Sequence, residues 1–291
     1  MPHPSPQVRV PGAVTVALAL VTAALGGTAA LAAEPVDPRV ELSVGFYEPS
    51  FDSSIRLDSG ALGIGTGLDL ERDLGLDSSG QEWRAGVGFR LGERFRLDAE
   101  YVAFDREGSA TLNREVQFGD VVYAANAQLT SRVESSHADF SLRWAFVKTP
   151  TTELALSLGG SYLDFSAGIS GVAKATANGI PLGSTTIAEK TEASAPVPLV
   201  GLHAAFEPSD TVRVRLMGRW FDIDTFLSDY QGWTGTMTEY GVDVDWFVLP
   251  WLAVSGGYAG TRIDAEFDDG DNIGAVKYDF DGFRVGTIFA F

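Results

Sequence analysis

Apolar and polar residues alternate along most of this chain, and that period of two limits the folds open to it more than any other feature. In the segment 139–147, every second residue is large and apolar up to position 146, and the residues between are charged, polar or small. Successive side chains of a β-strand point to opposite faces, so this pattern predicts strands with one apolar and one polar face. The segments 82–91, 211–220 and 239–248 alternate in the same way. The chain is therefore expected to be all-β.

Short and long connectors alternate between these segments. The short ones are 91–94, 148–152, 207–210 and 249–251. The long ones are polar and rich in Gly and Ser, at roughly 48–80, 106–131, 166–194, 226–233 and 268–275. Tight periplasmic turns and longer outer loops are typical of a membrane barrel. We therefore predict an antiparallel, up-and-down transmembrane β-barrel of about ten strands, with eight or twelve as alternatives and both termini periplasmic.

A soluble β-sandwich is the alternative fold, because its strands also carry one apolar face. The positions of the aromatic residues favour lipid, since they lie near the ends of the predicted strands, as in the two interfacial girdles of a membrane barrel. Beside the short connectors lie Phe95, Trp144, Phe146, Phe206, Trp246 and Trp251, and near the long ones Trp83, Tyr101, Tyr162 and Trp220.

The N-terminal segment has the features of a secretory signal peptide. Arg9 precedes an apolar run over 12–25, and the small residues of 29–33 suit a signal peptidase. We predict a signal peptide over 1–33 and a barrel domain over 34–291. An uncleaved membrane anchor is the alternative, but the site is followed at once by acidic residues and prolines.

The C-terminus carries a separate signal. Large apolar residues and one Thr alternate from Phe283 up to the last residue, Phe291. This pattern resembles the terminal strand of outer-membrane proteins, which implies that Phe289 and Phe291 form an assembly signal for the barrel-assembly machinery. In overall layout the chain resembles small OmpA- and OmpW-type barrels and the uncharacterised outer-membrane β-barrel proteins of Gram-negative bacteria. The resemblance implies a cell outer-membrane location, porin-like architecture, and contact with membrane lipid and lipopolysaccharide.

Charge and composition exclude several classes of function. The formal net charge of −18 disfavours nucleic acid as a partner, because phosphate binding needs a basic surface. The absence of Cys excludes disulfides, thiolate metal sites and Cys nucleophiles. The segment 268–272 resembles part of a calcium loop but lacks the ordered ligands and the closing Glu, which favours a solvated outer loop. We expect no cofactor and no metal site.

The polar faces of the predicted strands should line the barrel lumen, and they hold basic and acidic residues in balance. We predict a lumen network made of Arg84, Arg90, Arg96, Asp98, Glu100, Asp139, Arg143, Arg213, Arg215, Arg219, Glu239, Asp243, Asp245 and Arg284. Glu41 and Glu82 are further inward acidic candidates. Unpaired charges in a narrow, lipid-walled lumen are costly, so such residues are expected to compensate one another.

One hairpin allows a sharper prediction. In an antiparallel pair, directly opposed residues have position numbers with a constant sum. A single register of the segments 211–225 and 234–248 opposes three arginines to three carboxylates on the same face. The predicted pairs are Arg213 with Asp245, Arg215 with Asp243, and Arg219 with Glu239.

Three functions remain open at this point. A barrel of eight to ten strands has little room beyond its own side chains, which favours a non-enzymatic barrel with a plugged lumen and a structural or slow passive-permeability role. A narrow channel for small or apolar solutes is the alternative, with a small solute as partner. A second alternative is an outer-rim lipid hydrolase or protease using His137, which stands between Ser135 and Asp139. Strand residues two apart lie about 7 Å from each other, so these three do not form a hydrogen-bonded series by themselves.

The segment 68–76 is expected to be a folded part of the first long loop.

Overall fold

Ten long strands form a closed antiparallel barrel in the computed structural model. The structure describes residues 38–58, 66–118, 121–177, 180–223, 233–268 and 273–291, so the predicted signal peptide over 1–33 lies outside it. In the described part of the chain, no helix is long and apolar enough to cross a membrane. The strands are β1 (Val40–Leu57), β2 (Leu68–Asp69), β3 (Glu82–Arg90), β4 (Phe95–Thr111), β5 (Val116–Phe118), β6 (Val121–Tyr123), β7 (Gln128–Lys148), β8 (Thr152–Ala177), β9 (Ile180–Ser209), β10 (Val212–Asp222), β11 (Trp233–Leu249), β12 (Leu252–Asp268) and β13 (Ile273–Ala290).

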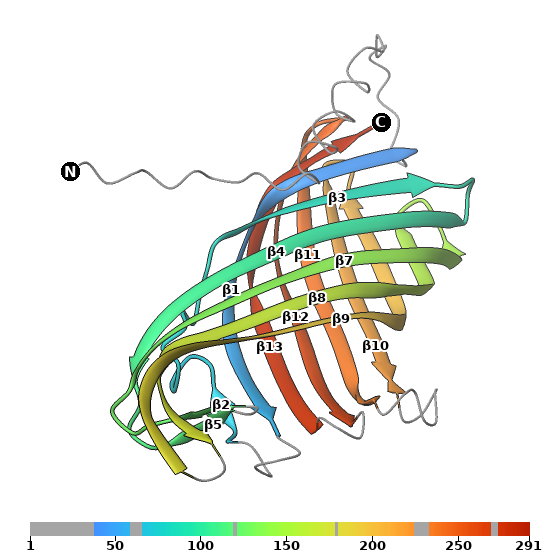
Figure 1. The fold of residues 1–291 in the computed structure, drawn as a ribbon. Coiled ribbons are helices and arrows are strands. Elements are labelled where there is room, and N and C mark those ends of the chain that lie inside the picture. Colours follow the sequence, from blue (N-terminus) through green and yellow to red (C-terminus); the bar gives the residue numbers. More distant parts are fainter. Residues whose placement is uncertain (1–37, 59–65, 119–120, 178–179, 224–232, 269–272) are drawn as a thin grey trace, which may run out of the picture.

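The barrel strands follow one another around the ring in chain order, and the last one pairs with the first. β13 pairs with β1 from Ala290 opposite Glu41 to Gly274 opposite Leu57. At the seam, the backbone N–H of Phe291 donates to the carbonyl of Val40 at 2.8 Å, and the reverse bond is 2.9 Å. Both ends of the barrel domain therefore lie at the end that carries the short turns (Figure 1). The predicted up-and-down barrel of about ten strands is confirmed.

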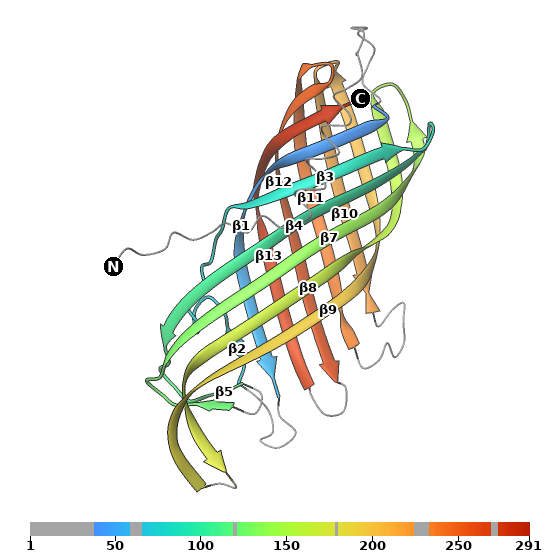
Figure 2. The same ribbon diagram turned by 45° about the horizontal axis from the view of Figure 1, so that its top comes forward.

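Several strands run much farther than the sequence suggested. The prediction of loops at 48–80, 106–131 and 166–194 was wrong for much of their length, because β1, β4, β7, β8 and β9 continue into them. The longest strands, β8 and β9, extend as a hairpin beyond the other strands (Figures 1 and 2). In the sequence of these outer parts large apolar and polar residues no longer alternate regularly, although the strand pairing continues.

A wide apolar band surrounds the barrel. Alternate side chains on its outer face are exposed and apolar, as for Trp83 (60% exposed), Leu158 (66%) and Phe283 (74%). Exposed hydrophobic surface of this extent is a large cost in water but is suited to lipid. Trp144 and Trp246 lie in this band near the short turns, and Trp220 lies near the long-loop end of β10, as expected for aromatic girdles, whereas Tyr162 lies well inside β8. The inner face of the same strands carries the buried polar residues.

The interior consists of layers whose order follows from the strands. From the short-turn end, the inward residues of β1 are first Glu41, then Tyr47 and Phe51, then Ile55. The charged layer therefore lies nearer the short turns, and an aromatic layer lies above it toward the long loops. The aromatic layer consists of Tyr47, Phe51, Val102, Phe104, Tyr278 and Phe280.

The first long loop folds back into the outer mouth of the barrel. Leu68, Leu70, Leu74 and Leu76 are at most 3% exposed, and they pack on Ile55 and on inward residues of β7 and β8. The predicted folded segment at 68–76 is therefore present, and we call residues 66–80 the lid. Gly75 has a φ of +68°, a left-handed conformation that favours glycine over residues with a Cβ. A Cβ there would also lie 2.6 Å from the carbonyl oxygen of Ser109.

Candidate functional site: the charged lumen

All fourteen residues predicted to form the lumen network lie on the inward face of the barrel strands. Their positions follow from strand parity, since each faces the same side as the fully buried Asp245. The register proposed for β10 and β11 is the observed one: Arg213 opposes Asp245, Arg215 opposes Asp243, and Arg219 opposes Glu239. The polar strand faces thus meet inside the barrel, where lipid cannot reach them.

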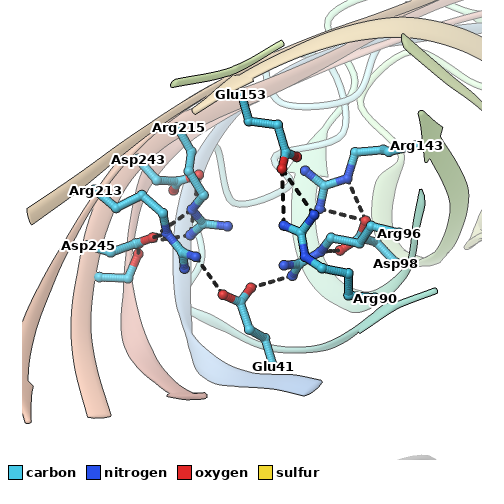
Figure 3. Close-up of polar contacts among 11 residues, drawn as sticks. Glu41, Arg90, Arg96, Asp98, Arg143, Glu153, Arg213, Arg215, Asp243 and Asp245 are labelled. Atoms are coloured by element: carbon cyan, nitrogen blue, oxygen red, sulfur yellow. Dashed lines mark hydrogen bonds and ion pairs between the residues drawn. The ribbon is translucent and has the colours of Figure 1, made fainter. Parts of the chain in front are cut away.

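Nine of the inward charges form one continuous chain of alternating sign around the lumen, and all of them except Arg284 are labelled in Figure 3. In order, its members are Arg143, Asp98, Arg96, Glu41, Arg213, Asp245, Arg215, Asp243 and Arg284. We call this the inner chain. It contains five arginines and four carboxylates, so it carries one excess positive charge.

Glu41 joins the two halves of the inner chain. Its carboxylate Oε1 accepts a bond of 2.6 Å from Nη1 of Arg213 on β10, and Oε2 contacts Arg96 on β4. Figure 3 shows the two groups on facing walls with Glu41 between them. All three residues are at most 8% exposed. The polar alternation of β1 indicated that Glu41 faces inward, but not that it connects opposite walls.

Most of the remaining contacts of the inner chain are 3.0 Å or shorter, and one is longer. On one side, Asp98 accepts from Nε of Arg143 at 2.6 Å and from Nε of Arg96 at 2.8 Å. On the other, Asp245 accepts from Nε of Arg213 at 3.0 Å and lies 2.7 Å from Nε of Arg215. Asp243 lies 3.9 Å from Arg215, its partner in the register, and is held more closely by Arg284 at 2.6 Å.

A neighbouring pair shows what the sequence prediction missed. Glu153, the second residue of β8, accepts bonds of 3.1 Å from both terminal nitrogens of Arg90. Glu153 follows a short turn, where strand ends are hardest to place from sequence. Its parity with the inward Ala155 and Ser157 was the available signal.

Farther toward the long loops lies a second group, which we call the outer cluster: Arg219, Asp139 and Glu239. One nitrogen of Arg219, Nη2, contacts both carboxylates, lying 3.2 Å from Asp139. One guanidinium therefore faces two carboxylates, which leaves one excess negative charge. Beside it, Arg84 and Glu100 form a separate two-bond pair at 2.6 and 3.2 Å.

The Ser135, His137 and Asp139 side chains are each engaged with other residues. Ser135 lies 2.9 Å from the hydroxyl of Tyr278, and Asp139 pairs with Arg219. The His137 ring is 4% exposed and lies edge-on to Phe104 and Phe280, with ring centroids 5.9 and 5.1 Å away. His203 faces the lumen nearer the short turns and lies 3.0 Å from Oγ of Ser157.

Among the described residues, no group of three or more His, Asp or Glu is arranged to hold a metal ion. The calcium-loop hypothesis for 268–272 falls largely outside them.

A buried arginine holds the lid in place, and sequence reasoning did not find it. Arg106 on β4 is 3% exposed and donates to Oε1 of Glu71 in the lid at 2.5 Å and to the hydroxyl of Ser53 at 3.0 Å. Its guanidinium also lies 4.0 Å from the centre of the Phe51 ring. The backbone N–H of Ser53 completes the contact by donating to Glu71 at 2.9 Å. This latch connects the lid to two barrel strands.

The latch should make the lid sensitive to acid. Burial raises the pKa of Glu71, but hydrogen bonds from Ser53 and Arg106 and the charge of Arg106 more than offset it, so the pKa is lowered from 4.5. A carboxyl whose pKa is lowered by folding contributes stability above its unfolded pKa and loses it as the pH falls through the folded value. We expect amide exchange of residues 66–80, corrected for its intrinsic pH dependence, to accelerate below about pH 4.5.

The matched variant for this test is Glu71→Gln. It should show faster exchange of the lid already at neutral pH and no further acid step. Asp105→Asn, an exposed outward carboxylate on β4, serves as the control with an unchanged profile. Equal lid exchange in wild type and Glu71→Gln at every pH would show that the latch does not hold the lid.

Comparison with known proteins supports the fold. No protein-family model and no curated protein matches the chain. The outer-membrane protease OmpT of Escherichia coli aligns with 91% of this chain and all of its own, with a TM-score of 0.57 and 12% identity. The outer-membrane protein OprG of Pseudomonas aeruginosa (88% of this chain, 97% of its own, TM-score 0.38, 10% identity) and the toluene transporter TodX of Pseudomonas putida (88% and 90%, 0.31, 9%) also align. The chain has the fold of a bacterial outer-membrane β-barrel, as the terminal strand implied.

Proposed function

We propose that this chain is a non-enzymatic integral barrel of the outer membrane with a lumen closed at rest and a structural or slow passive-permeability role. The observation that carries the proposal is the inner chain, whose members cross between facing walls through Glu41. Oppositely charged side chains that contact each other across the lumen leave no wide aqueous path between them. In a low-dielectric surrounding, such pairs resist separation because each partner would be left unpaired.

The outer mouth supports the same proposal. The lid covers the aromatic layer, and the latch ties it to β1 and β4. A permeating solute would therefore meet two barriers in series, one apolar and one charged. The side chains of Ser135, His137 and Asp139 are occupied in this interior, which favours a role in packing for them over catalysis.

Bilayer measurements test this function directly. Refolded full-length mature protein, verified by its altered gel mobility when unboiled, should show no sustained large conductance in planar bilayers. Brief, small openings fit slow permeability. Steady, large conductance of the wild-type barrel would contradict the closed lumen.

A narrow channel for small solutes is the second candidate, and one observation favours it. A cavity of about 200 Å³ lies in the lumen, lined by charged residues of β3, β4, β7, β10 and β11. Proteins seldom keep polar space of this size without water or a ligand in it. In the channel interpretation, the two barriers open in turn and the cavity holds the solute between them.

A further inference from the structure

The outer half of β9 has a neighbouring strand on one edge only. β8 pairs with β9 from Phe206 out to Ile180, whereas β10 pairs with it only as far as Val200. Among the described residues, no strand pairs with the other edge of β9 between Ile180 and Leu199, and we call this the free edge. It belongs to the hairpin that extends beyond the other strands (Figure 2). An unpaired strand edge presents N–H and C=O groups that can pair with another chain.

Two prolines show which backbone groups point to the free edge. Pro196 and Pro198 lie within the ladder to β8, although proline has no backbone N–H. In a strand, the N–H and C=O of alternate residues point to opposite edges. Proline is tolerated in a sheet where its nitrogen faces away from the neighbouring strand. Even-numbered residues in this part of β9 therefore direct their backbone groups to the free edge, and the ladder to β10 ends at Val200, just before Pro198.

The free edge carries a charge pattern that is complementary to itself. Lys190 and Glu192 form an ion pair on the outward face of β9, and their side chains are 60% and 67% exposed. Antiparallel pairing of two copies of β9 about a twofold axis at position 191 places Lys190 of each copy directly opposite Glu192 of the other. The four charges then alternate in sign around a square. A shift of the register to the next even-numbered pairing opposes Lys190 to Lys190 or Glu192 to Glu192, so the charges select one register.

The symmetry of such a pair determines where the second copy lies. Adjacent antiparallel strands of two identical chains are related by a twofold axis perpendicular to their sheet. The hairpin continues the barrel wall, so this axis runs parallel to the membrane plane and the second copy is inverted, as in a facing membrane. Two copies in one membrane are related by an axis along the membrane normal. Their strands, tilted by about 35–45°, would cross at roughly 70–90° and could not pair.

We propose that the free edge of β9 pairs with the free edge of a second copy in a facing outer membrane, so that the protein joins two membranes. The hairpin is the described part of the chain that extends farthest from the short turns, and it would meet a facing surface first (Figure 1). Backbone bonds supply the attraction, and Lys190 with Glu192 sets the register. The pairing needs no change in the lumen, so it goes beyond the proposed function and does not depend on it.

The test uses refolded mature protein in lipid nanodiscs that contain one barrel each, because both faces of a disc are accessible. The salt concentration is about 0.15 M, so that repulsion between the acidic copies is screened beyond roughly 8 Å. We expect particles of two discs to increase with protein concentration in sedimentation, and electron microscopy should show the discs face to face. Single discs at every concentration, or discs joined side by side, would overturn the proposal.

Charge reversal at the free edge tests the register. Lys190→Glu and Glu192→Lys each oppose like charges when the variant pairs with itself, and each should weaken the association about tenfold. A mixture of the two variants opposes unlike charges at both positions and should associate as tightly as wild type. Lys277→Glu is the matched control, since it makes the same change at a 65% exposed position on β13, and it should associate normally. A mixture as weak as its components would contradict the proposed pairing.

Ser194→Pro blocks the free edge without changing a charge. Position 194 has the parity of Pro196 and Pro198, so its pairing with β8 should persist. The variant should fold, as judged by its gel mobility without boiling, and lose the particles of two discs. Unchanged association of the folded Ser194→Pro barrel would place the contact outside the free edge and refute the proposal.

Discussion

Replacing Glu41 with Gln should both destabilise the barrel and open it to ions. The substitution leaves Arg96 and Arg213 without the carboxylate that they share, and removing one partner of a buried ion pair costs about 3–5 kcal/mol. Each arginine keeps one other partner, Asp98 or Asp245, so the two halves of the inner chain should remain on their own walls. They would then repel each other across the lumen. We expect a lower urea midpoint and frequent conductance events in planar bilayers.

The matched control is Glu153→Gln, which removes the same charge from the same layer. Glu153 on β8 pairs with Arg90 on β3, which also joins strands that are not neighbours in the ring, but the pair is not part of the inner chain. This variant should lose some stability and still stay closed. Conductance that rises equally in both variants would show that total lumen charge, and not the bridge through Glu41, keeps the barrel shut. A closed Glu41→Gln barrel would contradict the proposed role of the bridge.

Deleting Phe291 should remove most of the assembled protein from the outer membrane. The resemblance of the last strand to an assembly signal motivates this expectation, and the structure adds a physical reason. Phe291 forms the two backbone bonds with Val40 at the end of the seam, and the ring of Phe289 stacks on Trp251 with centroids 6.5 Å apart. The folded fraction in outer-membrane preparations, measured by altered gel mobility without boiling, should fall severalfold.

Two experiments can separate the role of Phe291 as an assembly signal from its role in structural contacts. Refolding into detergent needs no assembly machinery, so purified protein lacking Phe291 should fold there with nearly the wild-type yield. Trp246→Ala removes an exposed aromatic at the same end of the barrel, and it should assemble normally in cells. An equal loss of folded protein in detergent and in cells would assign Phe291 to stability alone.

Strand parity explains why so much of the fold was predictable. In the membrane band, lipid selects apolar side chains on one face and the lumen tolerates polar ones on the other, so the alternation is strong in 139–147 and 239–248. Water contacts the strands beyond the band, and that selection ends. The outer parts of β8 and β9 therefore resembled loops in sequence, although they are held by the same ladder of pairing.

The site was predictable only as far as neighbouring strands determine it. Arg213 and Asp245 belong to one hairpin, and their register follows from matched charges on one face. The contact of Glu41 with Arg213 joins strands that are not adjacent in the ring, and it depends on the tilt and stagger of the whole barrel. The latch at Arg106 depends on how the lid folds back, which no periodic pattern specifies.

The position of Glu41 on the seam strand links closure of the lumen to completion of the chain during biogenesis. Glu41 and Arg213 are separated by 172 residues, and β1 has its second neighbour, β13, only once the ring is closed. Contacts between such distant positions form late, because the chain between them must first be ordered. A barrel that lacked its final strand would keep an open sheet edge. The closed ring of strands and the inner chain would then not stabilise each other. We therefore expect the lumen to close to ions at the same step at which β1 pairs with β13. An assembly intermediate with an ion-permeable lumen would then be short-lived.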